Sequence, residues 1–323
     1  MAEPPFDIIT IGDMCVDLLV DIGDVPIRFG QAEQWIPGYT LEMGGSADIF
    51  ACQAARLDLR VGILGCVGDD VYGQLVLRRL QECGVDTRHV RIDPTVKTGL
   101  GLTLCRPNGD RSILTYGGSL NAIQPEDVTD RFLRSGRHLH YSSYYLQTNL
   151  LPAVPDLFRR ARALGLTISL DTNWDPAETW DGGLAAALTA VNLFLPNEQE
   201  ALAITRAPSR AEALDRLAAT VPAAAVKCGA QGAEVAAGSV RLRIPVEPVS
   251  SVVDTVGAGD CFDAGFVAGW LRGLDLAACA EIANACARAT LSAPGGVAGQ
   301  LHAADVCFGH GREAMSNCAC GGR

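Results

Sequence analysis

Hydrophobic and polar positions follow two different periods along this chain. Short apolar runs rich in β-branched residues, at 7–11 and 61–65, predict strands buried on both faces. Segments 47–57, with Ser46 as N-cap, and 73–83, closed by Gly84, show the period of amphipathic helices. Helix and strand patterns then alternate over 139–145, 151–164, 167–171, 184–189, 193–195, 198–204, 211–220 and 224–227, followed by short strands at 233–237 and 240–244 and helices at 258–273 and 276–292. Strands separated by helices predict βαβ units and a parallel sheet covered on both faces.

Four segments do not fit that sheet. Residues 16–21 and 35–42 alternate apolar and polar positions, as do 98–106 and 111–116 on either side of the turn Pro107-Asn108-Gly109-Asp110. Asn-Gly between alternating runs is a strong hairpin signal. We therefore expect a small separate β-layer, formed by 14–42 and 98–117, that projects from the main sheet as a lid.

Composition narrows the class of protein. The chain has 323 residues, 48% of them hydrophobic and 20% charged, which excludes wholesale disorder. No apolar run reaches the ~20 residues of a membrane-spanning helix, and the N-terminus lacks the basic and apolar regions of a secretion signal. The net charge of −11 disfavours nucleic acid as a partner. We expect a single α/β domain of residues 1–323 in the cytoplasm, without nucleic-acid or membrane partners.

Cysteine usage adds no disulfide framework. Most of the 12 cysteines lie inside apolar segments, where a free thiol behaves as a small buried hydrophobe. Cys318 and Cys320 are exceptions, in a glycine-rich end without the spacing of a zinc site. We expect residues 308–323 to form a flexible tail.

One glycine-rich segment carries the strongest chemical signal. The chain contains neither a P-loop, nor a dinucleotide fingerprint, nor a nucleophile elbow. It does contain Asp254-Thr255-Val256-Gly257-Ala258-Gly259-Asp260-Cys261-Phe262 at the start of a predicted helix. Free backbone amides at a helix N-terminus form an anion site. An aspartate there makes sense if Asp260 accepts a proton from a hydroxyl while the amides hold a transferring phosphoryl group. The alternative is a glycine-rich turn whose aspartate only satisfies the helix dipole.

At these residues the chain resembles the PfkB, or ribokinase-like, family of carbohydrate kinases. Residues 254–262 resemble the C-terminal signature of that family, and Gly44-Gly45-Ser46-Ala47 resembles the start of its N-terminal signature. Segments 7–17, 65–70, 197–200, 226–232 and 283–285 resemble further family motifs in the same order. The resemblance implies a doubly wound parallel sheet with a small β-sheet lid.

The resemblance also implies a reaction, the transfer of the ATP γ-phosphoryl group to a primary alcohol. Asp260 would be the general base, and the amides of Gly257, Ala258 and Gly259 the anion hole. The implied substrate-binding residues are Asp17, Gly44, Gly45 and Asp48. The implied nucleotide-binding residues are Lys227, Gly229, Gly232, Asn284 and Asn197. Glu200 and Asp171 would hold Mg²⁺ through water, and Asp254 a monovalent cation such as K⁺.

Several of these residues also fit structural roles. Asn197 and Glu200 match the pattern of a helix capping box. Lys227 is one of only two lysines, with Lys97, and fits either a phosphate contact or a solvated strand end. Asn284 fits a helix residue that bonds its surroundings. His138 and His140 fall on one face of a strand without a third metal ligand, which favours a structural role.

The sequence departs from the family pattern on the acceptor side. Relatives usually have asparagine where this chain has Ile49, and Asp48 points about 100° away from that position on a helix. Relatives often have arginine where Asp175 stands. Arg106 and Arg111 on the predicted hairpin fit a phosphosugar contact or, by preference, solvated charges.

The sequence therefore predicts an ATP-dependent kinase of a non-phosphorylated pentose or ketohexose. The alternatives are a sugar-phosphate kinase, a nucleoside kinase in which Tyr39, Tyr144 and Tyr145 stack on a base, and a catalytically silent regulator that binds sugar or nucleotide. The exposed edges of the lid strands make a homodimer through the lid plausible.

Overall fold

The computed structural model describes residues 4–108 and 110–308, and a mostly parallel sheet runs through them. This sheet has nine strands in the order β13-β12-β11-β10-β9-β8-β1-β4-β5. The strands are β1 (Phe6–Ile11), β4 (Val61–Gly68), β5 (Asp86–Asp93), β8 (Gly136–Tyr141), β9 (Thr167–Leu170), β10 (Leu193–Phe194), β11 (Ala223–Lys227), β12 (Ala233–Ala237) and β13 (Val240–Ile244). Strands from β5 to β11 pair in parallel, and β12 and β13 add antiparallel pairs. The predicted parallel sheet is confirmed.

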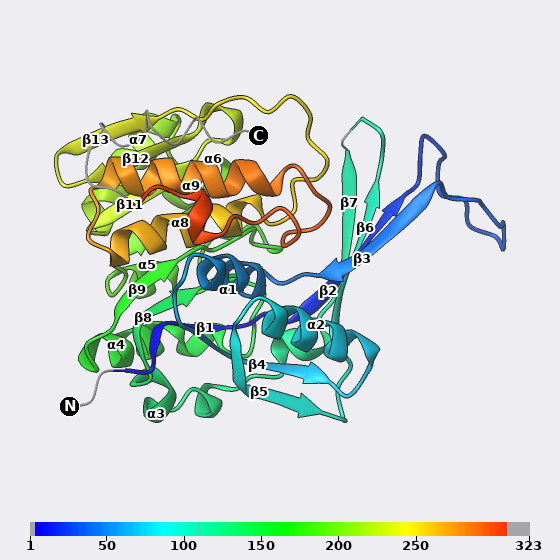
Figure 1. The fold of residues 1–323 in the computed structure, drawn as a ribbon, viewed down its shortest axis with the longest axis horizontal. Helices are drawn as coiled ribbons and strands as arrows, with labels where there is room; N and C mark the ends of the chain where they lie inside the picture. The colour runs from blue at the N-terminus through cyan, green and yellow to red at the C-terminus, as the bar shows by residue number, and fades with distance from the viewer. Residues whose placement is uncertain (1–3, 109, 309–323) are drawn as a thin grey trace.

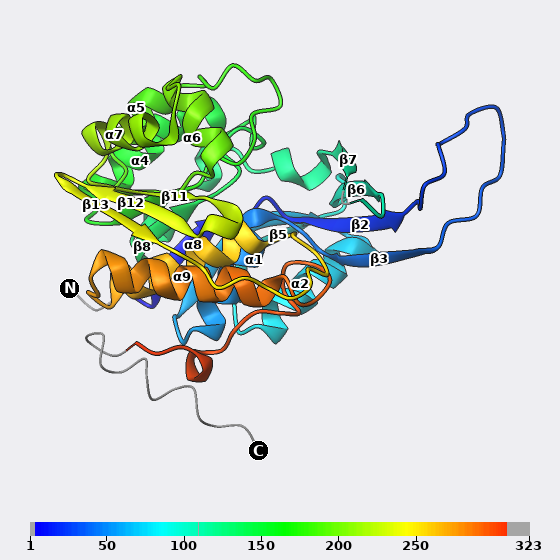
Figure 2. The same cartoon turned by 90° about the horizontal axis from the view of Figure 1, so that it is seen from above.

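Helices cover both faces of this sheet, as Figures 1 and 2 show. One face packs against α1 (Ser46–Arg56), α2 (Val71–Glu82), α8 (Ala258–Leu271) and α9 (Leu276–Thr290). The other packs against α3 (Asp130–Leu133), α4 (Val154–Ala163), α5 (Leu184–Leu188), α6 (Glu198–Thr205) and α7 (Arg210–Thr220). On β1, Ile8 joins the first apolar layer and Ile9 the second, because successive side chains of a strand point to opposite faces. A strand buried on both faces is thus apolar throughout, as the sequence pattern of β1 indicated.

A second, smaller sheet stands apart from the main one. Its strands are β2 (Cys15–Asp21), β3 (Gly38–Met43), β6 (Gly99–Cys105) and β7 (Arg111–Tyr116), in the order β3-β2-β6-β7. It projects from one end of the molecule, with the β2–β3 connection extending farthest (Figures 1 and 2). The separate β-layer is confirmed, although β3 begins at Gly38 rather than at residue 35. Trp35 belongs to the connection and is 98% exposed.

Three local predictions are wrong. Ser46 is the first residue of α1 and not its cap; the N-cap is Gly45, at φ +84°. Strand β5 was not expected at all, because its sequence carries four charged residues and a histidine among eight. The segment predicted as 139–145 forms β8 only to Tyr141, after which the chain leaves the sheet.

Short 3₁₀ turns complete the described chain, at Gly118–Asn121, Pro125–Asp127, Leu151–Ala153, Gly229–Gln231 and Ala303–Asp305. In the residues with assigned structure, every helix is too short or too polar to cross a bilayer. The cysteine-containing tail expected at 308–323 lies outside the described residues, except for Phe308.

Candidate active site

Several predicted site residues meet at one end of the main sheet. Asp171 follows β9, Asn197 follows β10 and Lys227 ends β11, so these neighbouring parallel strands deliver three polar side chains to one edge. Opposite them lies the start of α8, with Asp260 in its first turn. One cavity is lined by these residues together with Ser46, Asn173, Glu200, Gly229 and Gly259. Ligands of open α/β sheets typically bind at the carboxyl ends of the strands.

The start of α8 has the geometry of an anion site. Gly257 is the N-cap at φ +75°, a left-handed conformation that favours glycine. A Cβ at this position would stand 2.5 Å from the Cα of Gly296, so a side chain is also excluded by space. The first amides of a helix have no partner within it, and here they point from a loop without bulky side chains. Gly257 and Gly259 thus offer backbone donors next to Asp260, while the Ala258 amide makes a long bond of 3.4 Å to the carbonyl of Thr255.

Asp260 is almost completely buried, at 8% exposure. Burial raises the pKa of its carboxyl from 3.8 to about 8, and the nearby charge of Asp171 adds to the rise. The ammonium of Lys227 opposes it. A carboxyl with a pKa near neutrality is suited to accept a proton from a hydroxyl during a reaction.

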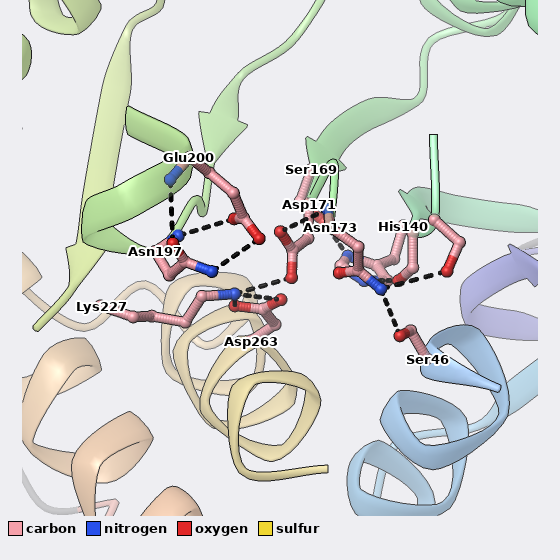
Figure 3. A network of polar contacts seen from close by, with 11 residues as sticks. Ser46, His140, Ser169, Asp171, Asn173, Asn197, Glu200, Lys227 and Asp263 are labelled. Carbon is pink, nitrogen blue, oxygen red and sulfur yellow. Dashed lines mark hydrogen bonds and ion pairs between the residues drawn. The ribbon is translucent and has the colours of Figure 1, made fainter. Parts of the chain in front are cut away.

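Lys227 is a buried cation held by two carboxylates. Its Nζ lies 2.7 Å from Oδ2 of Asp171 and 3.2 Å from both carboxylate oxygens of Asp263 (Figure 3). Its side chain is 12% exposed, which excludes a solvated strand end. Asp171 and Asp263 raise its pKa further above the usual range, despite burial.

Asn197 and Glu200 form the capping box of α6. The Asn197 amide donates to Oε2 of Glu200 at 2.8 Å, and the Glu200 amide donates to Oδ1 of Asn197 at 2.9 Å. The structural interpretation is therefore confirmed, and both residues also line the cavity with Asp171. Burial and the charge of Asp171 raise the pKa of Glu200 to about 7.

A second group of predicted residues lies where α1 meets the small sheet. The carboxylate of Asp17, on β2, would lie 2.5 Å from a Cβ at either Gly44 or Gly101, so both glycines let it approach the backbone. Burial raises the pKa of Asp17 to about 6, helped by the neighbouring Asp13. Gly45, at φ +84°, has no room for a Cβ because the carbonyl oxygen of Asp13 would lie 2.8 Å away.

Asp48 does not reach the cavity. It is fully buried between Gly12 and Gly45, and neither carboxylate oxygen has a hydrogen-bond partner in the described residues. Burial and the charge of Asp13 raise its pKa well above the usual range. Ile49 packs against Gly257 and Gly296, so its side chain supports the loop that begins α8 instead of presenting a polar group.

A mostly apolar pocket adjoins the cavity on the other side of Lys227. Its lining includes Val246, Val252, Ala258, Phe262, Ala287 and Leu291, together with Gly229, Gly232 and Asn284. Asn284 donates from Nδ2 to the carbonyl of Ile244 at 3.1 Å, which fixes β13 to α9. Gly232, at φ +84°, has no space for a side chain, because a Cβ would stand 2.1 Å from the same carbonyl oxygen.

Asp254 joins two loops near the start of α8. Its Oδ1 accepts a hydrogen bond from the Val256 amide at 3.0 Å, and its Oδ2 from the Gly295 amide at 2.9 Å. The loop before α8 is thereby tied to the segment that follows α9.

Sequence reasoning missed one polar cluster. Asp13 accepts hydrogen bonds from the Ser46 and Ala47 amides and from Oγ of Ser143, while Asn173 donates to Oγ of both serines. Asn173 lies at φ +52°, a conformation that asparagine tolerates better than most residues. Its place after the predicted strand 167–171 was the available signal. The contacts of Ser143 with Asp13 and of Asn173 with Ser46 join residues about 130 positions apart, and a single sequence does not predict such contacts.

Other polar and aromatic residues are structural. Oγ of Ser169 lies 2.7 Å from Nε2 of His138 and 2.8 Å from Nδ1 of His140, whose ring stacks on Phe50 at 3.6 Å. Burial lowers the pKa of His140 well below its usual value, so the ring is neutral. The structural interpretation of the two histidines is confirmed. Tyr144 and Tyr145 are core residues, which contradicts their stacking on a base.

Comparison with known proteins agrees with this geometry. Residues 7–303 match the model of the pfkB family of carbohydrate kinases. The ATP-dependent ribose-1-phosphate kinase of Halopiger xanaduensis is 31% identical over 291 residues, covering 89% of this chain and 93% of the relative.

Solved structures lead to the same family. The adenosine kinase of Sinorhizobium meliloti is 26% identical at a TM-score of 0.80, covering 90% of this chain and 95% of its own. A candidate ribokinase II from E. coli, solved with ATP and Mg²⁺, is 25% identical at a TM-score of 0.82, covering 93% and 97%. The site and the fold thus agree with the comparisons: this chain belongs to the pfkB family of carbohydrate kinases, phosphotransferases with an alcohol group as acceptor.

Proposed function

We propose that this protein transfers the γ-phosphoryl group of ATP to a primary hydroxyl of a sugar. The observation that carries the proposal is the buried Asp260 carboxyl beside the amides that begin α8. A base and an anion site at one helix end suit the transfer of a phosphoryl group to an alcohol.

In the proposed reaction, Asp260 accepts the proton of the acceptor hydroxyl. The acceptor oxygen forms a bond to the γ-phosphorus as the bond to the β-phosphate oxygen breaks, and ADP leaves. The amides of Gly257, Ala258 and Gly259 stabilise the charge on the transferring group. Phosphoryl transfer depends mainly on positioning and electrostatics, and these residues supply both.

The apolar pocket suits the adenine ring of ATP. It is continuous with the polar cavity through Lys227, Gly229 and Gly259, which line both. A nucleotide that spans the two would place its base against Ala287 and its phosphates near Lys227. Gly229 and Gly232 leave room for the ribose, and Asn284 holds the wall of the pocket. ATP as co-substrate is supported by the Halopiger relative and by the E. coli structure.

The cavity also suits a hydrated magnesium ion. In residues 4–108 and 110–308, no group of three or more His, Cys, Asp or Glu side chains is arranged to hold a metal. Mg²⁺ is usually bound through one or two carboxylates, several waters and substrate phosphates, so Asp171 and Glu200 are a fitting donor set. Asn197 would fix Glu200. The ion would neutralise charge on the phosphates.

On the acceptor side we propose a neutral sugar, bound by Asp17 and by the backbone of Gly44 and Gly45. Carboxylates accept hydrogen bonds from hydroxyls and would repel an anionic acceptor. The small sheet, within 14–42 and 98–117, would close over the sugar as a lid because Asp17 lies on β2. Asp48 stays a proposed contact of the sugar, because its carboxylate lies against Gly45 and neither of its oxygens has a hydrogen-bond partner in the described residues.

A sugar phosphate is the second candidate acceptor. Nη1 of Arg111, on β7, lies 3.2 Å from Oγ1 of Thr255, next to the anion-hole loop. This cation is positioned to offset the charge of a phosphate, and the Halopiger relative is a ribose-1-phosphate kinase. Arg106 pairs with Asp110 instead and is half-exposed.

The decisive experiment measures ADP release with ATP and Mg²⁺ against ribose, fructose, ribose 1-phosphate, fructose 6-phosphate and adenosine. Wild type is compared with Asp260→Asn and Arg111→Gln. The proposal predicts turnover of one neutral sugar, lost in Asp260→Asn and little changed in Arg111→Gln. Turnover of a sugar phosphate that depends on Arg111 would establish the second candidate, and turnover of adenosine alone a nucleoside kinase. ATP binding without turnover would favour a silent regulator.

Two further proposals concern a cation and assembly. Asp254 would also accept a monovalent cation such as K⁺, to be checked by replacing K⁺ with tetramethylammonium in the assay.

A homodimer through the small sheet would cover its exposed apolar side chains: Phe29, Trp35, Tyr39, Ile113, Leu114 and Tyr116. Light scattering at micromolar concentration would detect it. We expect the enzyme in the cytoplasm.

A further inference from the structure

Lys227 receives its charge partners from two different elements. Asp171 follows β9, and Asp263 lies on α8, and both point at Lys227 (Figure 3). Asp263 is one turn beyond Asp260. A single ammonium thus faces two carboxylates. The two carboxylates differ in what else they can contact.

Asp263 is closed off from solvent. Its side chain is 0% exposed, and it is absent from the lining of the cavity that contains Asp171 and Lys227. A buried carboxylate without a counter-ion is strongly unfavourable, so Asp263 needs Lys227 in every state of the site. Among the described residues, the one cation in contact with Asp263 is Lys227.

Asp171, by contrast, lines the cavity beside Asn197 and Glu200. Its bond to Lys227 is exchangeable, because a cation that enters the cavity can take over the carboxylate. Once Asp171 turns to such a cation, Lys227 keeps one full counter-charge, that of Asp263.

Lys227 also stands next to the anion hole. A Cβ at Gly259 would lie 3.5 Å from Nζ and 3.9 Å from Cδ and Cε of Lys227. The ammonium therefore lies beside the amides that begin α8, where the proposed function places the phosphates. An anion there would meet the helix N-terminus on one side and the ammonium on the other.

We propose that Asp263 is a positioning residue that anchors Lys227 beside the anion hole, so that Asp171 is free to exchange from Lys227 to the hydrated magnesium ion of the nucleotide. The inference rests on the proposed function and adds a residue to its phosphate site. Without Asp263, the ammonium would remain on Asp171 and compete with the metal.

The test measures binding, so that it does not depend on the acceptor. Calorimetry with a non-hydrolysable ATP analogue, in excess Mg²⁺ and in EDTA, gives the factor by which the metal strengthens binding. We expect Asp263→Asn to reduce this factor about tenfold, the scale of a lost partner behind a metal ligand. In EDTA the affinity should change little, because the ammonium still reaches the phosphates.

A matched control separates positioning from stability. Asp7 is also a buried aspartate, and it pairs with Arg60 and Arg137. It lies near the start of β1, whereas the candidate site lies at the carboxyl ends of the strands. Asp7→Asn should lower stability and leave the magnesium factor unchanged. If Asp263→Asn folds and Mg²⁺ strengthens its binding of the ATP analogue as much as in wild type, the proposal is overturned.

A second variant covers the case in which Asp263→Asn does not fold. Lys227→Met with Asp263→Asn removes both charges of the Lys227–Asp263 pair, and Asp171 remains as a carboxylate that lines the cavity without its ammonium partner. It should fold, bind the analogue about tenfold more weakly, and keep a magnesium factor at least that of wild type, because Asp171 is then free. A factor that falls in this variant would contradict the exchange. If the wild-type protein binds the analogue but phosphorylates no acceptor, the proposed function fails while this test still decides the role of Asp263.

Discussion

The carboxylate of Asp13 accepts a hydrogen bond from the amide of Ala47 at 2.9 Å, which joins the loop after β1 to the first turn of α1. The same carboxylate also accepts the Ser46 amide at 3.1 Å. Gly45, the N-cap of α1, has no side chain that could do this. Asp13 therefore caps α1 from a distant part of the sequence and holds the Gly44–Gly45 loop in place.

Replacing Asp13 with alanine tests this relationship. The loss of a helix cap should lower the free energy of unfolding by about 1–2 kcal/mol. Because the loop it holds belongs to the proposed sugar site, the KM for the acceptor should rise more than the KM for ATP. Denaturant unfolding and steady-state kinetics measure the two effects. Asp275→Ala is the matched control, since Asp275 caps α9 by accepting the Ala278 amide at 2.8 Å. An equal rise in the acceptor KM for both variants would contradict the role of Asp13.

The main fold was predictable because most strands of the sheet are buried on both faces. Such strands read as apolar runs, and β1, β4 and β11 were found that way. Strand β5 escaped because it lies at the edge of the sheet and its sequence, DTRHVRID, is largely polar. Charged edge strands prevent pairing with other chains, and that same property removes the hydrophobic signal.

Some residues of the candidate site were expected from the sequence, and others are shown only by the structure. Asp171, Asn197 and Lys227 were expected at the site through the family resemblance, and the structure brings them together because each lies at the carboxyl end of a strand of one parallel sheet. Asp263 was not, because only the packing of α8 against β11 shows that its side chain meets Lys227. Asp48 was expected in the sugar site; its side chain is fully buried on α1 beside Gly45, and its contact with the sugar stays a prediction.

The pH dependence of activity follows from Asp260. Its pKa is raised to about 8 by burial and by the charge of Asp171, and a general base must be ionised. We therefore expect kcat/KM to rise with pH up to about 8 and to level off above it. Below pH 7, Glu200 with a pKa of about 7 and Asp17 with a pKa of about 6 should steepen the fall. Assays from pH 5.5 to 9.5 at saturating Mg²⁺ measure the profile. A profile that declines between pH 6 and 8 would exclude Asp260 as the base.

The anion hole can be tested with a pair of glycines in similar conformations. Gly257 lies at φ +75° and Gly273 at φ +76°, at the two ends of α8. Gly257→Ala places a Cβ 2.5 Å from the Cα of Gly296 and should displace the loop, whereas Gly273→Ala meets nothing within 4 Å. Both should lose about 1–2 kcal/mol of stability from the left-handed conformation. Only Gly257→Ala should also lose about 100-fold in kcat, the scale of one lost oxyanion donor. Comparable kcat values for the two variants would remove the anion hole from the mechanism.

The ion pairs of Asp7 stabilise the protein in a defined pH range. Hydrogen bonds from Arg60 are the largest cause that lowers the pKa of this carboxyl from 3.8 to about 2, and Arg137 adds to them. Because the folded pKa lies below the unfolded one, the stabilisation is complete above pH 3.8 and disappears as the pH falls towards 2. Asp7→Asn should therefore cost about 2 kcal/mol near pH 7, and the difference from wild type should shrink below pH 4.

Urea unfolding from pH 7 down to pH 3 measures the contribution of Asp7. The control is Asp110→Asn, which removes the exposed pair with Arg106 and should cost less than about 0.5 kcal/mol at every pH. The burial of Asp7, whose side chain is 10% exposed, is what distinguishes the two pairs, since both involve arginine. A loss in Asp7→Asn that is the same at pH 7 and pH 3 would show that its carboxylate contributes by shape and hydrogen bonding rather than by charge.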